Sequence, residues 1–148
     1  MEENNGRSFN CAESTMIGID REFMLPGFSQ YCMRMASILG GGISGFGEVC
    51  GAVSGAVLSL GLMLGTDGTE DVEEFKAKRT KAREFVKQYL QDFTDSWGSV
   101  QCRYLVEMDE GKIPAAGLLR SKGPPEKLCE EYVDWSVKKV LELRRTLE

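Results

Sequence analysis

Cysteine is the residue type through which this sequence could do chemistry. The five cysteines are Cys11, Cys32, Cys50, Cys102 and Cys129, and no two of them form a CxxC pair. A thiolate is both a nucleophile and a metal ligand. The chain has no histidine, which excludes a Ser–His or Cys–His catalytic pair, His-ligated zinc and His-ligated haem. Any metal would therefore have to be held by thiolates and carboxylates.

Four of the cysteines lie close to the predicted starts of helices. A helix N-terminus carries free N–H groups and a partial positive charge, so it favours an anion such as a thiolate. Cysteine is also among the most buried residue types, and packing alone would explain one such thiol. Cys11 lies three residues after Ser8, and Cys102 lies three residues after Ser99. Cys50 lies early in a helix that is predicted to begin near Glu48, and Cys129 lies four residues after Pro125. If these helix N-termini converge, the four thiols would form one shared site. Cys32 lies three residues after Ser29, so it could also lie in the first turn of a helix.

The elements that must position these thiols are predicted to be helices, because alternating runs typical of strands are few. We expect a single domain over residues 1–148, with its core at about 8–146. The predicted fold is all-α, a compact bundle of five or six helices around a central, buried Gly/Ala-rich helix. The expected helices cover residues 8–19, 29–39, 48–64, 69–93, 100–106 and 125–143, with Thr69 as one N-cap and 107–125 as a loop.

The glycine-rich stretch "GGGISGFGEVCGAVSGAVLSLGLMLG" at residues 40–65 has three possible interpretations: a nucleotide-binding loop, a membrane span or the setting of a reactive cysteine. Gly40, Gly42 and Gly45 satisfy G-x-G-x-x-G, but that fingerprint has meaning only after a strand in a βαβ unit. A helical pattern precedes it and no GKS or GKT follows, so we expect no nucleotide cofactor. The glycines instead end one helix and allow a sharp return into the next.

The apolar part of that stretch is too short for a membrane span. Residues 49–64 are apolar or small, whereas a spanning helix needs about 20 such residues. A helix that is apolar on all sides is then the central helix of a bundle. Gly51 and Gly55 form GxxxG, a small-residue face that lets a neighbouring helix approach closely.

The composition of the chain restricts the kinds of binding partner and the cellular compartment that we expect. The net charge is −5, which argues against nucleic-acid binding because phosphate contacts need clustered Lys and Arg. The odd number of cysteines is not typical of a disulfide-bonded secreted protein, and the polar start "MEENNGRSFN" has no apolar segment typical of a secretory signal. We therefore expect a cytoplasmic protein with no membrane or nucleic-acid partner. A helix-packed homodimer is compatible with the buried-helix pattern.

At the cysteines the chain resembles the family of redox-active proteins named for the pattern C_GCAxxG_C_C. The resemblance covers about residues 8–143, and its most specific part is the glycine loop with CGAxxG. The matching segments are "FNCAE" around Cys11, "GGGISGFGEVCGAVSGAVLSLGL" around Cys50, "FTDSWGSVQCRYL" around Cys102 and "LCEEYV" around Cys129. The resemblance implies a small, mostly helical, intracellular prokaryotic protein with cysteine-based redox chemistry. Cys32 lies outside these motifs.

The family is also similar to the cysteine-bearing part of split-Soret cytochrome c, where four cysteines are thought to hold an iron–sulfur cluster. This chain has no CxxCH, so it lacks covalent haem sites. The first hypothesis is an electron-transfer protein in which Cys11, Cys50, Cys102 and Cys129 hold such a cluster. Zinc fits this set less well. The wide spacing is unusual, because cluster ligands commonly arrive in close local pairs.

Two further hypotheses remain open at the level of sequence. The second is thiol–disulfide exchange, or redox sensing, without a metal: Cys50 would attack and Cys11 or Cys102 would resolve, with a redox partner that the sequence does not identify. The third is a structural or accessory module in which the cysteines only pack. In either case the acidic run Glu107, Asp109 and Glu110 is interpreted as a solvated face, because it lacks the spacing of a calcium loop.

Overall fold

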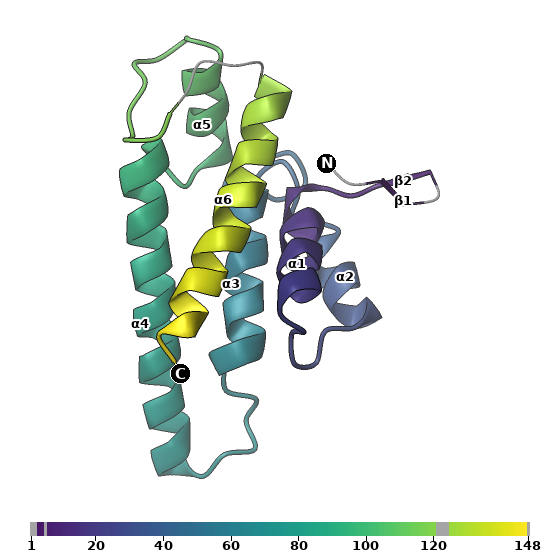
Figure 1. Cartoon of the computed structure of the whole chain (residues 1–148), viewed down its shortest axis with the longest axis vertical. Coiled ribbons are helices and arrows are strands. Elements are labelled where there is room, and N and C mark those ends of the chain that lie inside the picture. Colours follow the sequence, from purple (N-terminus) through teal and green to yellow (C-terminus); the bar gives the residue numbers. More distant parts are fainter. Residues whose placement is uncertain (1–2, 5, 121–124, 148) are drawn as a thin grey trace.

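A computed structural model describes residues 3–4, 6–120 and 125–147. Within that part of the chain the fold is a compact all-α bundle, which confirms the predicted fold class. Figure 1 shows the arrangement of the helices. The elements are β1 (Glu3–Asn4), β2 (Arg7–Ser8), α1 (Cys11–Glu22), α2 (Gln30–Ala36), α3 (Gly51–Leu64), α4 (Val72–Trp97), α5 (Cys102–Asp109) and α6 (Pro125–Arg145). The two short strands pair antiparallel, and the sequence did not predict them.

Helix α3 is the centre of the bundle, and α1, α4 and α6 all pack against it (Figure 1). Its small-residue face is the reason that α1 can approach so closely. A Cβ atom at Gly55 would lie 2.5 Å from the backbone oxygen of Ala12 and 2.9 Å from Cβ of Thr15. The predicted role of the GxxxG pattern is thereby confirmed. No described helix is long and apolar enough to cross a membrane.

Gly55→Ala should therefore destabilise the fold, although alanine is the better helix former. Overpacking against a fixed backbone costs about 1–3 kcal/mol, and replacing glycine in a helix regains at most about 1 kcal/mol. Gly61→Ala is the matched control, because a Cβ there meets no atom within 4 Å and should stabilise by about 0.5–1 kcal/mol. Urea denaturation followed by circular dichroism measures both; equal effects would contradict the close approach of α1 to α3.

The second half of α4 packs its aromatic side chains against α6. The ring of Phe93 meets that of Trp135 edge-on at 5.5 Å, and Trp97 meets Tyr132 edge-on at 5.0 Å. A buried hydrogen bond of 2.7 Å joins the hydroxyls of Tyr89 and Ser136 on the same two helices. The buried residues of α4, which are Tyr89, Phe93 and Trp97, thus all lie toward its C-terminal end. Figure 1 shows the first turns of α4 projecting below the bundle.

Several helices begin later than the sequence indicated. Helix α1 is capped by Asn10 rather than Ser8, and α4 by Asp71 rather than Thr69. The backbone N–H and hydroxyl of Thr69 instead bond to the Asp67 carboxylate, so this threonine belongs to the preceding turn. Helix α6 begins at Pro125 as predicted.

Candidate thiol site

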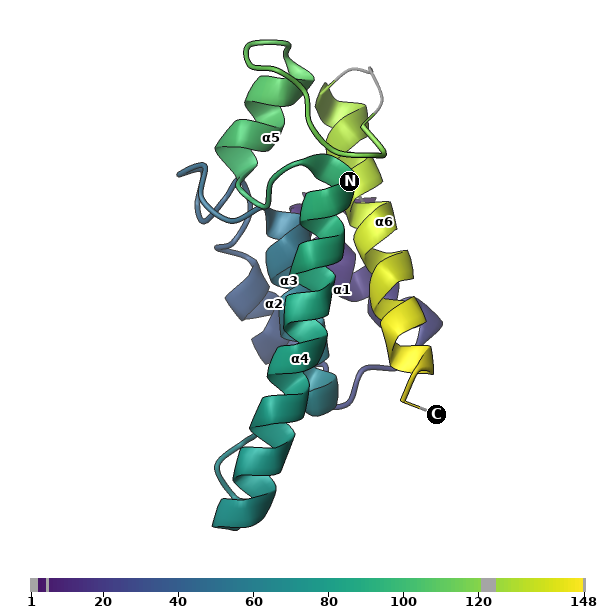
Figure 2. The ribbon, with the colours of Figure 1, turned by 90° about the vertical axis from the view of Figure 1, so that its left-hand side faces the viewer.

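A small backbone ladder sets the starting points of α3 and α5. The N–H of Cys50 donates to the Val100 oxygen at 2.8 Å, and the N–H of Cys102 donates to the Glu48 oxygen at 2.6 Å. An isolated antiparallel bridge joins the residues that precede the two cysteines. Two thiols that are far apart along the chain therefore start neighbouring helices. Figure 2 shows α5 above the start of α3, with the upper part of α6 beside both.

Two glycines make room for the thiols at this junction. Gly42 has a left-handed φ of 74°, and a Cβ there would lie 2.5 Å from the Glu48 nitrogen and 2.8 Å from Cβ of Cys102. A Cβ at Gly51 would lie 2.9 Å from Cβ of Cys11. The glycine-rich segment thus brings the backbone close to two thiols, and the element directly before it is the helix α2.

A capping box places Cys11 at the first position of α1. The side chain of Asn10 accepts from the Glu13 N–H at 2.8 Å, and the Asn10 N–H donates to the Glu13 carboxylate at 2.9 Å. The Asn10 amide also donates to the backbone oxygens of Ala36 and Ser37. The start of α1 is therefore tied to the end of α2, and Cys11 is fixed against the start of α3.

Cys11 and Cys129 form a hydrogen-bonded pair of thiols across α1 and α6. The Cys11 thiol donates to Cys129, which lowers the pKa of Cys129 to about 7 despite its partial burial. The same hydrogen bond is the largest cause of the raised pKa of Cys11, with burial second. The pair therefore releases its first proton near pH 7 and keeps its second proton to much higher pH.

Cys50 lies within electrostatic range of this pair but is deeply buried. Cys50 is only 5 % exposed, and burial raises the pKa of its thiol to about 12. The Cys50 sulfur makes no cap hydrogen bond, and the nearby N–H groups of Val53 and Ala52 oppose only part of the rise in pKa. Cys50 is the N-cap of α3 rather than a residue inside the helix. This environment does not favour Cys50 as the attacking thiol.

Cys102 is the first residue of α5 and is half-buried. Burial, followed by the nearby Cys129 and Asp109, raises the pKa of its thiol. The predicted gain from a helix N-terminus is therefore outweighed at both Cys50 and Cys102. The lowered pKa belongs instead to Cys129, the fifth residue of α6, and comes from a second thiol.

Cys32 occupies a different setting. It is buried in a small apolar cluster with Ala12, Met16 and Ala36, and its thiol donates to the Gly27 oxygen at 3.5 Å. All five cysteines are thiols rather than disulfides in the described structure. The thiol of Cys11 interacts electrostatically with those of Cys50, Cys102 and Cys129, so the structure brings these four thiols near one another.

The four gathered thiols match an iron–sulfur cluster in donor chemistry. Thiolates are the usual ligands of such clusters. Yet over residues 3–4, 6–120 and 125–147, no three Cys, Asp or Glu side chains are placed as a metal-binding group.

Three polar residues beside the thiols were not identified from the sequence. Asp109, interpreted above as part of a solvated face, is buried: its side chain is 1 % exposed and pairs with Arg120, at 6 %. Tyr132 completes the cluster from α6. The spacing of Tyr132, one turn after Cys129, is the only local signal in the sequence that could have indicated its place near the site.

The fold and the site define an all-α protein with four thiols gathered where three helices begin and a fourth passes. The chain belongs to the family described as "Putative redox-active protein (C_GCAxxG_C_C)", whose model matches residues 9–143. The resemblance at the cysteines is thereby confirmed. Residues 50–55 read CGAVSG, so Cys50 and Gly51 stand in the opposite order to that in the family's name. No curated protein and no solved structure matches the chain.

Proposed function

We propose that this protein is a thiol–disulfide redox protein in which Cys129 attacks and Cys11 resolves. The observation that carries the proposal is the hydrogen bond from the Cys11 thiol to Cys129, with the pKa of Cys129 lowered to about 7. A thiol whose pKa lies near ambient pH combines a large thiolate population with good nucleophilicity. The close packing of α1 on α6, where a Cβ at Gly18 would lie 2.8 Å from Val137, supports the same pairing.

The proposed reaction transfers two electrons from the dithiol to a substrate disulfide. The Cys129 thiolate attacks one substrate sulfur, forming a mixed disulfide and expelling the other sulfur as a thiolate, which takes up a proton. Cys11 then loses its proton and attacks the Cys129 sulfur of the mixed disulfide. The products are a Cys11–Cys129 disulfide and two substrate thiols. The reverse reaction reduces the protein with an external dithiol.

Disulfide mapping tests this proposal directly. Lys or Arg residues separate every cysteine from the next, so each cysteine falls in its own tryptic peptide. Reduced protein treated with one equivalent of glutathione disulfide, then alkylated and digested, should yield a disulfide between the Cys11 and Cys129 peptides. Exclusive modification of Cys32, or no bond between Cys11 and Cys129, would overturn the proposal.

A second candidate function is electron transfer through an iron–sulfur cluster on Cys11, Cys50, Cys102 and Cys129. The observation that favours it is the electrostatic interaction of Cys11 with all three of the other thiols. Anaerobic purification with iron, sulfide and zinc analysis and a visible spectrum tests it. A brown protein that contains iron and sulfide, and that loses both in Cys50→Ser, would favour the cluster over the Cys11–Cys129 pair. A colourless protein that contains zinc would favour a Cys₄ zinc site.

The setting proposed for either chemistry is the cytoplasm, where thiols stay reduced until they meet a specific oxidant. The electron partner and a homodimer remain predictions from the sequence.

A further inference from the structure

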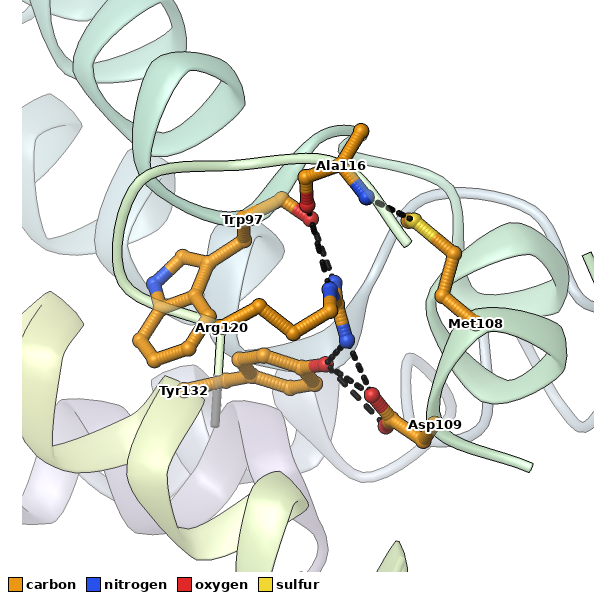
Figure 3. Close-up of polar contacts among 6 residues, drawn as sticks. All are labelled: Trp97, Met108, Asp109, Ala116, Arg120 and Tyr132. Carbon is orange, nitrogen blue, oxygen red and sulfur yellow. Dashed lines mark hydrogen bonds and ion pairs between the residues drawn. The ribbon is translucent and has the colours of Figure 1, made fainter. Parts of the chain in front are cut away.

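A buried polar cluster joins the end of α5 to α6. It consists of Asp109 at the end of α5, Arg120 in the following loop and Tyr132 on α6 (Figure 3). The side chains of Asp109 and Arg120 are 1 % and 6 % exposed, and Tyr132 is 3 % exposed. Burying three polar groups is costly unless each is hydrogen-bonded.

Each of these groups has partners. The Tyr132 hydroxyl donates to the two Asp109 oxygens at 2.8 and 3.0 Å, and it accepts from Nη1 of Arg120 at 2.9 Å. Arg120 also donates to the Asp109 carboxylate and to the backbone oxygen of Trp97, and its Nε donates to the Ala116 oxygen at 3.1 Å. One guanidinium therefore joins the end of α4, the end of α5, α6 and the loop that follows α5.

The cluster connects the two helices that carry Cys102 and Cys129. Helix α5 begins at Cys102 and ends at Asp109, and Tyr132 lies one turn after Cys129 on α6. The Asp109 carboxylate acts electrostatically on both thiols. The Tyr132–Asp109 hydrogen bonds join the end of α5 to α6, and Cys102 interacts electrostatically with Cys129.

We propose that Asp109, Arg120 and Tyr132 are positioning residues that hold Cys102 within reach of Cys129, so that Cys102 exchanges with the Cys11–Cys129 disulfide. The inference rests on the proposed function. In this step the Cys102 thiol loses its proton and attacks the Cys129 sulfur; the Cys102–Cys129 bond forms as the Cys11–Cys129 bond breaks. Cys11 leaves as a thiolate and takes up a proton, so no net oxidation occurs. The disulfide then joins α5 to α6, with Cys102 next to Gly42 of the glycine-rich loop.

Tyr132→Phe tests the positioning with little change in packing, because the ring that meets Phe93 and Trp97 is kept. After oxidation with one equivalent of glutathione disulfide, rapid alkylation and tryptic mapping give the ratio of Cys102–Cys129 to Cys11–Cys129 disulfide. Loss of a buried hydrogen bond to a carboxylate should lower this ratio about tenfold. The Cys11–Cys129 disulfide should still form in this variant, because the packing of α1 on α6 at Gly18 and Val137 is untouched.

Tyr89→Phe is the matched control, because it removes a buried interhelical hydroxyl bond, to Ser136, of the same kind. Its disulfide ratio should equal that of the wild type. Equal ratios in all three proteins, or equal losses in both variants, would overturn the positioning role. A wild type that forms Cys11–Cys129 but no Cys102–Cys129 bond would overturn the exchange step alone, whereas a missing Cys11–Cys129 bond would remove the proposed function as well.

A second variant tests the same contact if Tyr132→Phe does not fold, as a loss of its helical circular dichroism signal would show. Asp109→Asn keeps an oxygen acceptor for the Tyr132 hydroxyl but removes the charge that strengthens the bond. The ratio of Cys102–Cys129 to Cys11–Cys129 should fall about threefold in this variant. An unchanged or larger ratio would contradict the proposal.

Discussion

Cys129→Ser is expected to lower the rate of thiol–disulfide exchange about 100-fold or more, to the level of the uncatalysed reaction. The reason is that the nucleophile is a thiolate, and Cys129 is the thiol whose pKa is lowered to about 7. A serine hydroxyl does not ionise in this range and cannot attack a disulfide. The measurement is the initial rate of reduction of a small aromatic disulfide by the reduced protein at pH 7.

Two serine variants serve as controls for that loss. Cys32→Ser removes a thiol that packs in a separate apolar cluster and should leave the rate unchanged. Cys50→Ser should keep most of the rate, because the Cys50 thiol is buried and its pKa is about 12. Serine is also a favourable N-cap, so this variant should fold. A rate that depends on Cys50 rather than Cys129 would restore Cys50 as the attacking thiol.

Cys11→Ala is expected to change the pH dependence of Cys129. In the wild type, alkylation of Cys129 by iodoacetamide should reach half its maximal rate at about pH 7. Without the Cys11 donor, burial and the charges of Asp109 and Glu130, which all raise the pKa, act unopposed by that hydrogen bond. The pKa should rise to its ordinary value of about 8.5 or above, and the alkylation rate at pH 7 should fall about tenfold or more.

Cys11→Ser separates the hydrogen bond from the loss of packing. A serine hydroxyl can still donate to the Cys129 thiolate, so the midpoint should stay well below that of Cys11→Ala. Alkylated Cys129 is counted from its tryptic peptide by mass spectrometry, which excludes signal from the other thiols. Coinciding midpoints in the wild type and both variants would show that Cys11 does not set the reactivity of Cys129.

Much of the fold was predictable because it depends on local signals. Pro125 marks the start of α6 since its fixed φ suits the first helical turn. Gly51 and Gly55 indicated a close helix contact, and the contact with α1 exists. The misplaced start of α1 also had a local signal: Asn10 followed three residues later by Glu13 is capping-box spacing, whereas Ser8 lies in a strand.

The thiol chemistry was less predictable because it depends on contacts between distant segments. The helix N-terminus argument singled out Cys50, but burial outweighs the N–H groups that face it. The pairing of Cys11 with Cys129 arises where α1 crosses α6, and no spacing in the sequence encodes that crossing. Asp109 looked like one of several solvated acids; only the arrival of Arg120 and Tyr132 from other segments allows its burial.

The backbone ladder at the thiol site has a consequence for hydrogen exchange. The first N–H groups of a helix have no acceptor within the helix and normally exchange rapidly with solvent. Here the amide of Cys50 is bonded to Val100 and that of Cys102 to Glu48. Because the two bonds belong to one ladder, they open together. The two amides should therefore be protected for longer than other first-turn amides, and their deuterium uptake should follow a single time course.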